Sequence, residues 1–203
     1  MVPQIGATHR QMRMRVTLAS GSPQRKEILE KLGIEFEVVV PGVEELTEGD
    51  PEHLVVENAR RKAEAVEAVG LVIACDTDVV LDGEVLGKPA DELEAREYLD
   101  RMSGRAHTVM SGMVVTEVQT DLSPDTGDNK IRSGVEKTTV VFKQLSEEEK
   151  ERYVRFREWE GRSGGYAIQT LGSTLVERLE GSVSNVVGLP VGLLAELAPQ
   201  LFE

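Results

Sequence analysis

The segment LASGSPQRKEIL at residues 18–29 constrains the chain most, because it predicts a short strand, a tight turn and a helix in immediate succession. Ser22 is a favourable N-cap and Pro23 suits the first helical position, so the free backbone N–H groups and the positive end of the helix dipole face one spot. Ser20, Ser22 and Arg25 add side-chain donors, and the segment therefore predicts a phosphate site. The alternative is an ordinary capped helix that follows an edge strand.

Strands and helices alternate along the rest of the chain, with hairpins among them. Apolar runs and turn residues predict strands at 14–19, 36–40, 71–75, 79–81, 85–86, 109–118, 135–142, 166–169 and 173–179. Helices are predicted at 23–32, 51–68, 92–102 and 146–159, and from residue 189 onward. This order indicates an α/β fold with a mixed sheet. The polar, turn-rich segment 120–134 is expected to be a mobile loop.

Composition and charge limit the classes of function. With 203 residues and 40% hydrophobic content the chain can bury a core, which we expect in one domain at 14–203 after a flexible extension at 1–13. A formal charge of -13 argues against a nucleic-acid polymer as partner. No apolar run reaches the roughly 20 residues that cross a bilayer and no secretory signal is evident, so we expect a cytoplasmic protein. Cys75 lies in an apolar run, which predicts a buried, inert thiol.

Asp76 is the strongest candidate for chemistry. It follows the apolar run LVIAC at 71–75, which predicts a central strand, so we expect its carboxylate at the end of that strand, where open α/β sheets bind ligands. There it would bind a divalent metal or activate a water, and Glu44 and Glu45 would supply further metal ligands. The alternatives are a turn or cap role for Asp76 and a solvated loop for both glutamates.

Lys62 and Lys88 are candidate phosphate ligands, although most lysines are ordinary surface residues. Lys88 lies between Gly87 and Pro89. These small and rigid neighbours would fix the backbone so that the Lys88 ammonium group points toward a triphosphate. The chain has no GxxxxGK[ST] P-loop and no GxGxxG after a strand, which argues against two common classes of nucleotide site. His9, His53 and His107 lack the spacing of metal ligands, so a structural zinc site is not expected.

Seven sequence blocks, in order, make the chain similar to the Maf family of nucleoside triphosphate pyrophosphatases from Leu18 to about Leu197. The blocks are LASGSPQRKEILEKLG, VEE at 43–45, NARRKA around Lys62, ACDTDVVLDGEVLGKP at 74–89, SGRAH at 103–107, GGYAIQ at 164–169 and GSVSNVVGLP at 181–190. The resemblance implies a Maf/ITPase-like α/β fold in which helices flank an elongated, mixed central sheet and two lobes surround an active-site cleft. It also implies a homodimer, for which the sequence identifies no interface.

The resemblance further implies hydrolysis of a nucleoside triphosphate between the α and β phosphates, with a divalent cation, Mg²⁺ or Mn²⁺. Together with the turn analysis it predicts three groups of site residues. The catalytic residues are Asp76, Lys62 and Lys88, the substrate-binding residues are Ser20, Ser22, Gln24, Arg25, Thr77 and Gln169, and the metal ligands are Glu45 and Asp76. Splitting a phosphoanhydride requires cations and donors that stabilise negative charge, and this set contains them.

Base preference and the role in the cell stay open at this point. Thr77 and Gln169 correspond to positions of base choice, and their Asp-Thr and Ile-Gln contexts are similar to the branch that favours dTTP and UTP. Gln24 departs from the family's usual arginine at another position linked to specificity. Arg162, Ser163 and Gly165 stand where the family more often has Lys, Ala and Ala, and we expect these three differences to matter little. Alternatives are a house-cleaning enzyme for modified nucleotides and a nucleotide-binding regulator of cell division or septum formation without significant turnover.

Overall fold

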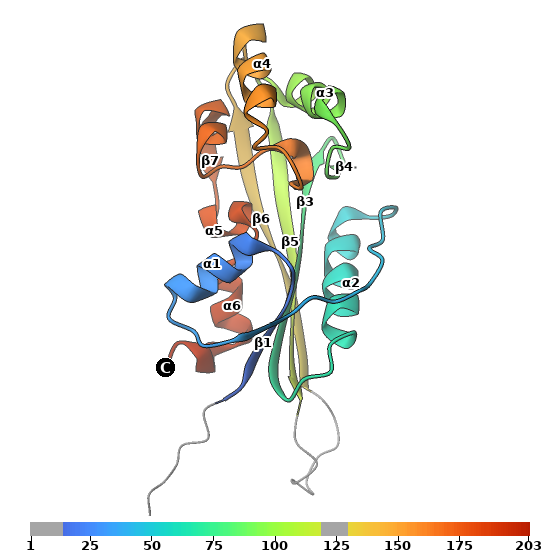
Figure 1. Cartoon of the computed structure of the whole chain (residues 1–203), viewed down its shortest axis with the longest axis vertical. Helices are drawn as coiled ribbons and strands as arrows, with labels where there is room; N and C mark the ends of the chain where they lie inside the picture. The colour runs from blue at the N-terminus through green and yellow to red at the C-terminus, as the bar shows by residue number, and fades with distance from the viewer. Residues whose placement is uncertain (1–13, 119–129) are drawn as a thin grey trace, which may run out of the picture.

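The computed structural model describes residues 14–118 and 130–203. The extension expected at 1–13 and most of the loop expected at 120–134 lie outside these residues. The molecule is elongated, with long strands that run through both lobes and helices packed against them (Figure 1). Within the described ranges, no helix combines the length and the apolar character needed to cross a membrane.

The strands form one mixed sheet. They are β1 (Val16–Ala19), β2 (Glu37–Val39), β3 (Gly70–Leu81), β4 (Glu84–Leu86), β5 (Ala106–Val118), β6 (Lys130–Phe142) and β7 (Val176–Glu180). Their order is β2-β1-β3-β5-β6-β7, and β4 pairs with β3. β1 is parallel to β2 and β3, and the other pairs are antiparallel. The predicted α/β class with a mixed central sheet is confirmed.

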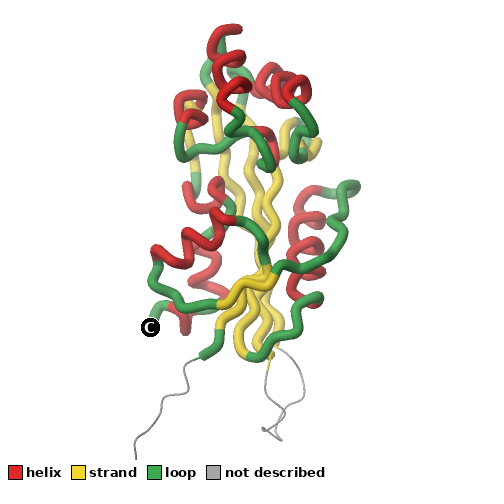
Figure 2. The backbone as a smooth tube through the Cα atoms, viewed as in Figure 1, coloured by secondary structure: helices red, strands yellow, loops and turns green. Residues whose placement is uncertain are grey.

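The helices divide between the two ends of this sheet. They are α1 (Pro23–Lys31), α2 (Pro51–Glu64), α3 (Glu92–Met102), α4 (Glu147–Phe156), α5 (Val183–Val187) and α6 (Val191–Leu197), with 3-10 turns η1 (Ser163–Gly165), η2 (Leu171–Leu175) and η3 (Pro199–Leu201). In one lobe α1 and α6 lie on one side of the sheet and α2 lies on the other, whereas α3 and α4 belong to the second lobe (Figure 2).

Strand alternation distributes the hydrophobic core over both faces of β3. Leu71, Ile73 and Cys75 join a cluster with residues of α1 and α6, whereas Val72 and Ala74 join a cluster with residues of α2. A third cluster fills the second lobe between the sheet, α3 and α4. Cys75 is fully buried and free, and burial raises its pKa, so the prediction of a buried thiol is confirmed.

β3 is longer than predicted. The strands expected at 71–75 and 79–81 are one continuous strand, because residues 76–78 keep their pairing with residues 110–112 of β5. The prediction that Asp76 closes the strand is therefore wrong, and so are its turn and cap alternatives. Polar side chains do not end the strand here, because a strand ends where its backbone pairing ends and this pairing continues.

Two helices end earlier than predicted. α2 ends at Glu64 rather than near residue 68, because the chain turns to enter β3 at Gly70. Gly70 has a φ of +100°, and a Cβ there would lie 2.3 Å from the Arg15 carbonyl oxygen, so the turn requires glycine. α4 ends at Phe156 rather than Trp159, because Arg157 adopts the left-handed conformation with a φ of 62°.

Some elements differ from prediction because distant contacts decide them. Residues 130–134 belong to β6 rather than to a loop, because they continue the antiparallel ladder with β5. Residues 166–169 form no strand, because the Ala167 N–H donates to the Tyr153 hydroxyl at 3.1 Å instead of to a neighbouring strand. α5 was not predicted, since five residues are too few to show a helical repeat.

Candidate active site

The site lies at an unpaired stretch of the β3 edge. β1 pairs with residues 71–73 of β3 and β4 pairs with residues 79–81, so residues 74–78 have no strand partner on that side in the described part of the chain. A cleft of about 600 Å³ lies there, lined by residues of both lobes. Because this edge is open, side chains from the two faces of β3 reach the same cleft.

All ten site residues predicted from the sequence line this cleft. They come from the turn before α1, the first turns of α1, the loop before α2, α2 itself, β3, the loop after β4 and the segment after η1. They are Ser20, Ser22, Gln24, Arg25, Glu45, Lys62, Asp76, Thr77, Lys88 and Gln169. The structure brings them together, and the individual roles assigned to them stay predictions.

Lys62 lies between two carboxylates. Its Nζ is 2.5 Å from Asp76 Oδ1 and 2.6 Å from Glu45 Oε1. The Lys62 and Asp76 side chains are each 9% exposed. α2 can lie directly on the sheet at this point because Gly112 of β5, which is opposite Asp76, has no side chain; a Cβ there would lie 2.3 Å from the backbone of Val55. This close approach brings lysine and aspartate together as a buried pair.

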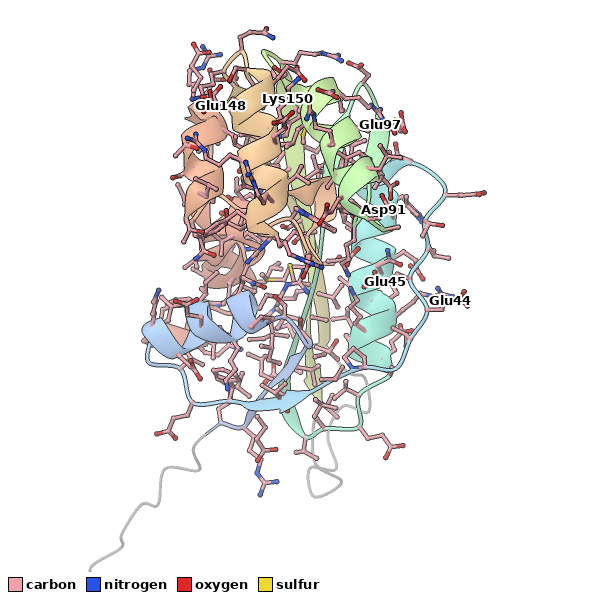
Figure 3. The ribbon with its side chains drawn as sticks, turned by 45° about the horizontal axis from the view of Figure 1, so that its top comes forward. Glu44, Glu45, Asp91, Glu97, Glu148 and Lys150 are labelled. Atoms are coloured by element: carbon pink, nitrogen blue, oxygen red, sulfur yellow. The ribbon has the colours of Figure 1, made fainter. Side chains whose placement is uncertain are left out.

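The two adjacent glutamates of the loop before α2 are placed differently. Both are exposed, but Glu45 lines the cleft and contacts Lys62, whereas Glu44 does not line it. Figure 3 shows Glu45 over α2 and Glu44 at the outer edge of the loop. Glu44 fits the solvated-loop alternative, whereas Glu45 is partly exposed on the same loop and also forms an ion pair with Lys62.

Asn58 is a site residue that the sequence analysis missed. Its side chain is buried, and its amide nitrogen donates to Asp76 Oδ2 at 3.1 Å and to the Leu46 carbonyl at 3.0 Å. Its amide oxygen accepts from the Leu46 N–H at 2.7 Å. Asn58 therefore orients the Asp76 carboxylate and holds the loop that carries Glu45. The available signal was a polar residue four positions before Lys62, on the same face of the helix.

The turn before α1 holds the Arg25 side chain in place. Its Nε donates to the Gly188 carbonyl at 2.8 Å, Nη1 to Ser20 Oγ at 3.1 Å and Nη2 to Thr77 Oγ1 at 3.2 Å. Ser22 caps the helix by accepting from the Arg25 N–H at 3.5 Å. These partners are neutral, and no carboxylate among the described residues forms an ion pair with Arg25. Its positive charge therefore remains available to an anion in the cleft.

Asp78 is a second cleft residue that the sequence analysis missed. It lies two residues after Asp76 and therefore on the same face of β3. Burial, together with the neighbouring charge of Asp76, raises the pKa of Asp78 to about 6. The Ser163 hydroxyl donates to Asp78 Oδ1 at 3.1 Å, which opposes that shift. The alternation of Asp76 and Asp78 was the sequence signal that could have identified it.

Lys88 and Gln169 are exposed residues of the second lobe that line the cleft. The segment that carries Lys88 is joined to η1 by a hydrogen bond from the Gly164 N–H to the Gly87 carbonyl at 2.9 Å. Gly164 has a φ of +69°, and a Cβ there would lie 2.6 Å from Val79, so η1 needs glycine to approach the sheet. This backbone contact holds the segment of Lys88 against η1, the 3-10 turn that precedes Gln169 in the chain.

The donor chemistry of Glu45 and Asp76 fits a hard divalent cation, because such ions prefer carboxylate oxygens. Over the described ranges, no three side chains of His, Cys, Asp or Glu are grouped to hold a metal ion. A Mg²⁺ ion at these two carboxylates would therefore need further ligands from substrate phosphates and water, as is usual for this ion.

Comparison with known proteins gives consistent relatives over nearly the whole chain. Residues 15–201 match the family described as Maf-like protein. The dTTP/UTP pyrophosphatase of Deinococcus radiodurans is 46% identical over 187 residues, which cover 90% of this chain and 91% of that protein. The dTTP/UTP pyrophosphatase of Pelotomaculum thermopropionicum is 42% identical, with 90% and 94% covered. A solved structure, the Ham1 protein of Staphylococcus aureus, aligns with 63% of this chain and 72% of its own, with a TM-score of 0.40 and 18% identity.

Proposed function

This chain belongs to the Maf family, and we propose that it hydrolyses nucleoside triphosphates between the α and β phosphates, releasing the nucleoside monophosphate and diphosphate. The proposed substrates are dTTP and UTP, the nucleotides in the names of its relatives. The observation that carries the proposal is one cleft in which the buried Lys62–Asp76 pair and the Arg25 guanidinium both line the walls. A phosphoanhydride needs both a group that activates water and cations that stabilise the charge on the phosphates.

In the proposed reaction, Asp76 activates the attacking water. The water oxygen forms a bond to the α-phosphorus, its proton passes to the Asp76 carboxylate, and the bond from the α-phosphorus to the bridging oxygen breaks. Lys62 and Asn58 orient the two carboxylate oxygens through contacts of 2.5 Å and 3.1 Å. Arg25 and Lys88 would stabilise the charge on the phosphates and on the departing diphosphate.

We assign Glu45 and Asp76 as the residues that would hold Mg²⁺ or Mn²⁺. When bound, the cation supplies positive charge to the phosphates. The chain's own residues then do the remaining work, which is to position the triphosphate and accept the proton. The cytoplasmic location and the homodimer stay predictions from the sequence.

The proposal is tested by incubating the purified protein with standard and modified triphosphates at fixed Mg²⁺. We expect monophosphate and diphosphate in equal amounts from dTTP and UTP under multiple turnover, and no product when the cation is removed with EDTA. Faster turnover of modified nucleotides would instead favour a house-cleaning role. Nucleotide binding without release of diphosphate would contradict the proposal and favour the regulator.

A further inference from the structure

Gln24 and Arg162 meet across the cleft. Gln24 lies in the first turn of α1 in one lobe, and Arg162 immediately precedes η1 in the other. Arg162 Nη1 and Nη2 lie 3.1 Å and 3.2 Å from the Gln24 side-chain amide, and Ser22 Oγ lies 3.0 Å from the same amide. A guanidinium carries donors only, so the amide is oriented with its oxygen toward Arg162 and its nitrogen toward Ser22.

Among the described residues, the Arg162 guanidinium has neutral partners. Its Nε donates to the Glu158 backbone carbonyl at 2.9 Å, and its other nitrogens face the Gln24 amide. No ion pair joins it to a carboxylate of the described residues. Arg101 and Arg105, by contrast, each contact a carboxylate at 2.6 Å on the protein surface. Arg162 therefore carries uncompensated positive charge in a chain whose formal charge is -13.

This charge faces the predicted phosphate site. Arg162, Gln24 and Ser22 line the same cleft as Arg25, and Ser22 is the N-cap of α1. A phosphate accepts two parallel, charge-assisted hydrogen bonds from a guanidinium, which are stronger than bonds to a neutral amide. An anion that enters the cleft would therefore displace Gln24 as the partner of Arg162.

We propose that Arg162 is a substrate-binding residue whose guanidinium exchanges Gln24 for the polyphosphate chain of a bound nucleotide, so that both lobes hold the same anion. The identity of this anion as a nucleotide rests on the proposed function. The proposal gives a role to a position that the sequence analysis expected to matter little.

The test compares Arg162→Gln and Arg162→Lys with the control Arg152→Gln, which changes an exposed arginine of α4 away from the cleft. We measure KM and kcat for dTTP, and the Kd of inorganic tripolyphosphate by calorimetry. For Arg162→Gln we expect KM and Kd to rise roughly 10- to 100-fold, because a hydrogen bond to a charged group is lost. For Arg162→Lys we expect KM and Kd values between those of the wild type and Arg162→Gln, since lysine keeps the positive charge but lacks the planar guanidinium. Arg152→Gln should match the wild type.

The expected pattern is a rise in KM with kcat within about threefold of the wild type, as for a contact made equally in ground state and transition state. Unchanged KM and Kd in Arg162→Gln would overturn the proposal, as would a wild-type protein that does not bind tripolyphosphate. If no nucleotide is hydrolysed, the proposed function fails and the tripolyphosphate series alone decides on Arg162. If thermal denaturation shows that Arg162→Gln is unfolded, Arg162→Lys carries the same comparison.

Discussion

Two lysines, one in each lobe, are buried and each contacts one aspartate and one glutamate. The Nζ–oxygen distances are 2.5 Å from Lys62 to Asp76, 2.6 Å from Lys62 to Glu45, 2.5 Å from Lys150 to Asp100 and 2.5 Å from Lys150 to Glu147. Lys150 lies on α4, beside α3 and away from the cleft (Figure 3). The ion-pair geometry is therefore nearly the same at a candidate active site and at a contact between two surface helices.

The two clusters differ in the exposure of their aspartates. The Asp76 side chain is 9% exposed and that of Glu45 is 41% exposed, whereas those of Asp100 and Glu147 are 48% and 72% exposed. An exposed pair is screened by water and stabilises little, whereas a buried charge must be compensated by its partner. Lys62, Asp76 and Glu45 line the cleft of about 600 Å³, whereas Lys150, Asp100 and Glu147 are not among its lining residues. Burial of the carboxylate and access to a cavity, rather than the ion pair itself, distinguish the candidate site.

The strongest test of this difference replaces one aspartate in each cluster. We expect Asp76→Asn to lower kcat/KM for dTTP by about 100-fold or more, because the general base and a cation ligand are lost. Asp100→Asn, in the other lobe, should leave kcat/KM within about twofold of the wild type. Steady-state kinetics measures both. Near-normal activity of Asp76→Asn would remove Asp76 from the mechanism.

The second test replaces each lysine with methionine, which keeps the apolar stem. Lys62→Met leaves the buried Asp76 carboxylate unpaired and should lower the free energy of unfolding by about 3 kcal/mol. Lys150→Met leaves carboxylates that water can solvate and should lower it by about 1 kcal/mol or less. Urea denaturation at neutral pH measures both values. Equal losses would show that the two clusters are energetically equivalent.

The third test concerns Asn58, which has no counterpart beside Lys150 among the described contacts. Asn58→Ala removes the hydrogen bonds to Leu46 and Asp76. We expect the free energy of unfolding to fall by about 2 kcal/mol and kcat to fall about tenfold. Glu64→Ala, on the exposed side of the same helix, is the control and should change neither. Loss of stability with unchanged kcat would show that Asn58 holds the loop and does not orient Asp76.

The smallest expected effect is a pH dependence of the α3–α4 contact. The hydrogen bond from Lys150 lowers the pKa of Asp100 below its ordinary value of 3.8. The folded state therefore favours the ionised carboxyl, so its contribution is present above pH 3.8 and is lost as the pH falls below that value. Because Asp100 is solvent-exposed, the contribution should stay below about 1 kcal/mol. Urea denaturation of wild type and Asp100→Asn should differ at pH 7 and converge in acid; a constant difference would contradict this assignment.

Local signals in the sequence predicted local structure well. Ser22 caps α1 and Asp50 caps α2, each through a hydrogen bond to the backbone three residues later. The Asp82-Gly83 turn between β3 and β4 also forms, with φ values of 54° and 83°. These features depend on atoms a few residues apart, so residue type and spacing are enough to predict them.

Features that depend on distant residues were missed or misplaced. Asp76 lies within β3 rather than at its end, because β5 continues to pair with it. The contacts of Asn58 with Asp76 require α2 to lie directly on the sheet, which Gly112 of another strand permits. Neither fact is visible in the residues next to Asp76 or Asn58, because each depends on which strand lies alongside.

The amino-acid sequence by itself determined the order and type of most elements, their caps and turns, and ten of the polar residues that line the cleft, although it did not identify Asn58 or Asp78. The tertiary structure decided how these residues meet: the open edge of β3, the buried pair of Lys62 and Asp76, and the contact of Gln24 with Arg162 across the lobes. The physical reason is the distance along the chain between the interacting residues. Caps and turns are stabilised by hydrogen bonds within a few residues, whereas the burial of a charge and the shape of a cleft depend on segments that only folding brings together.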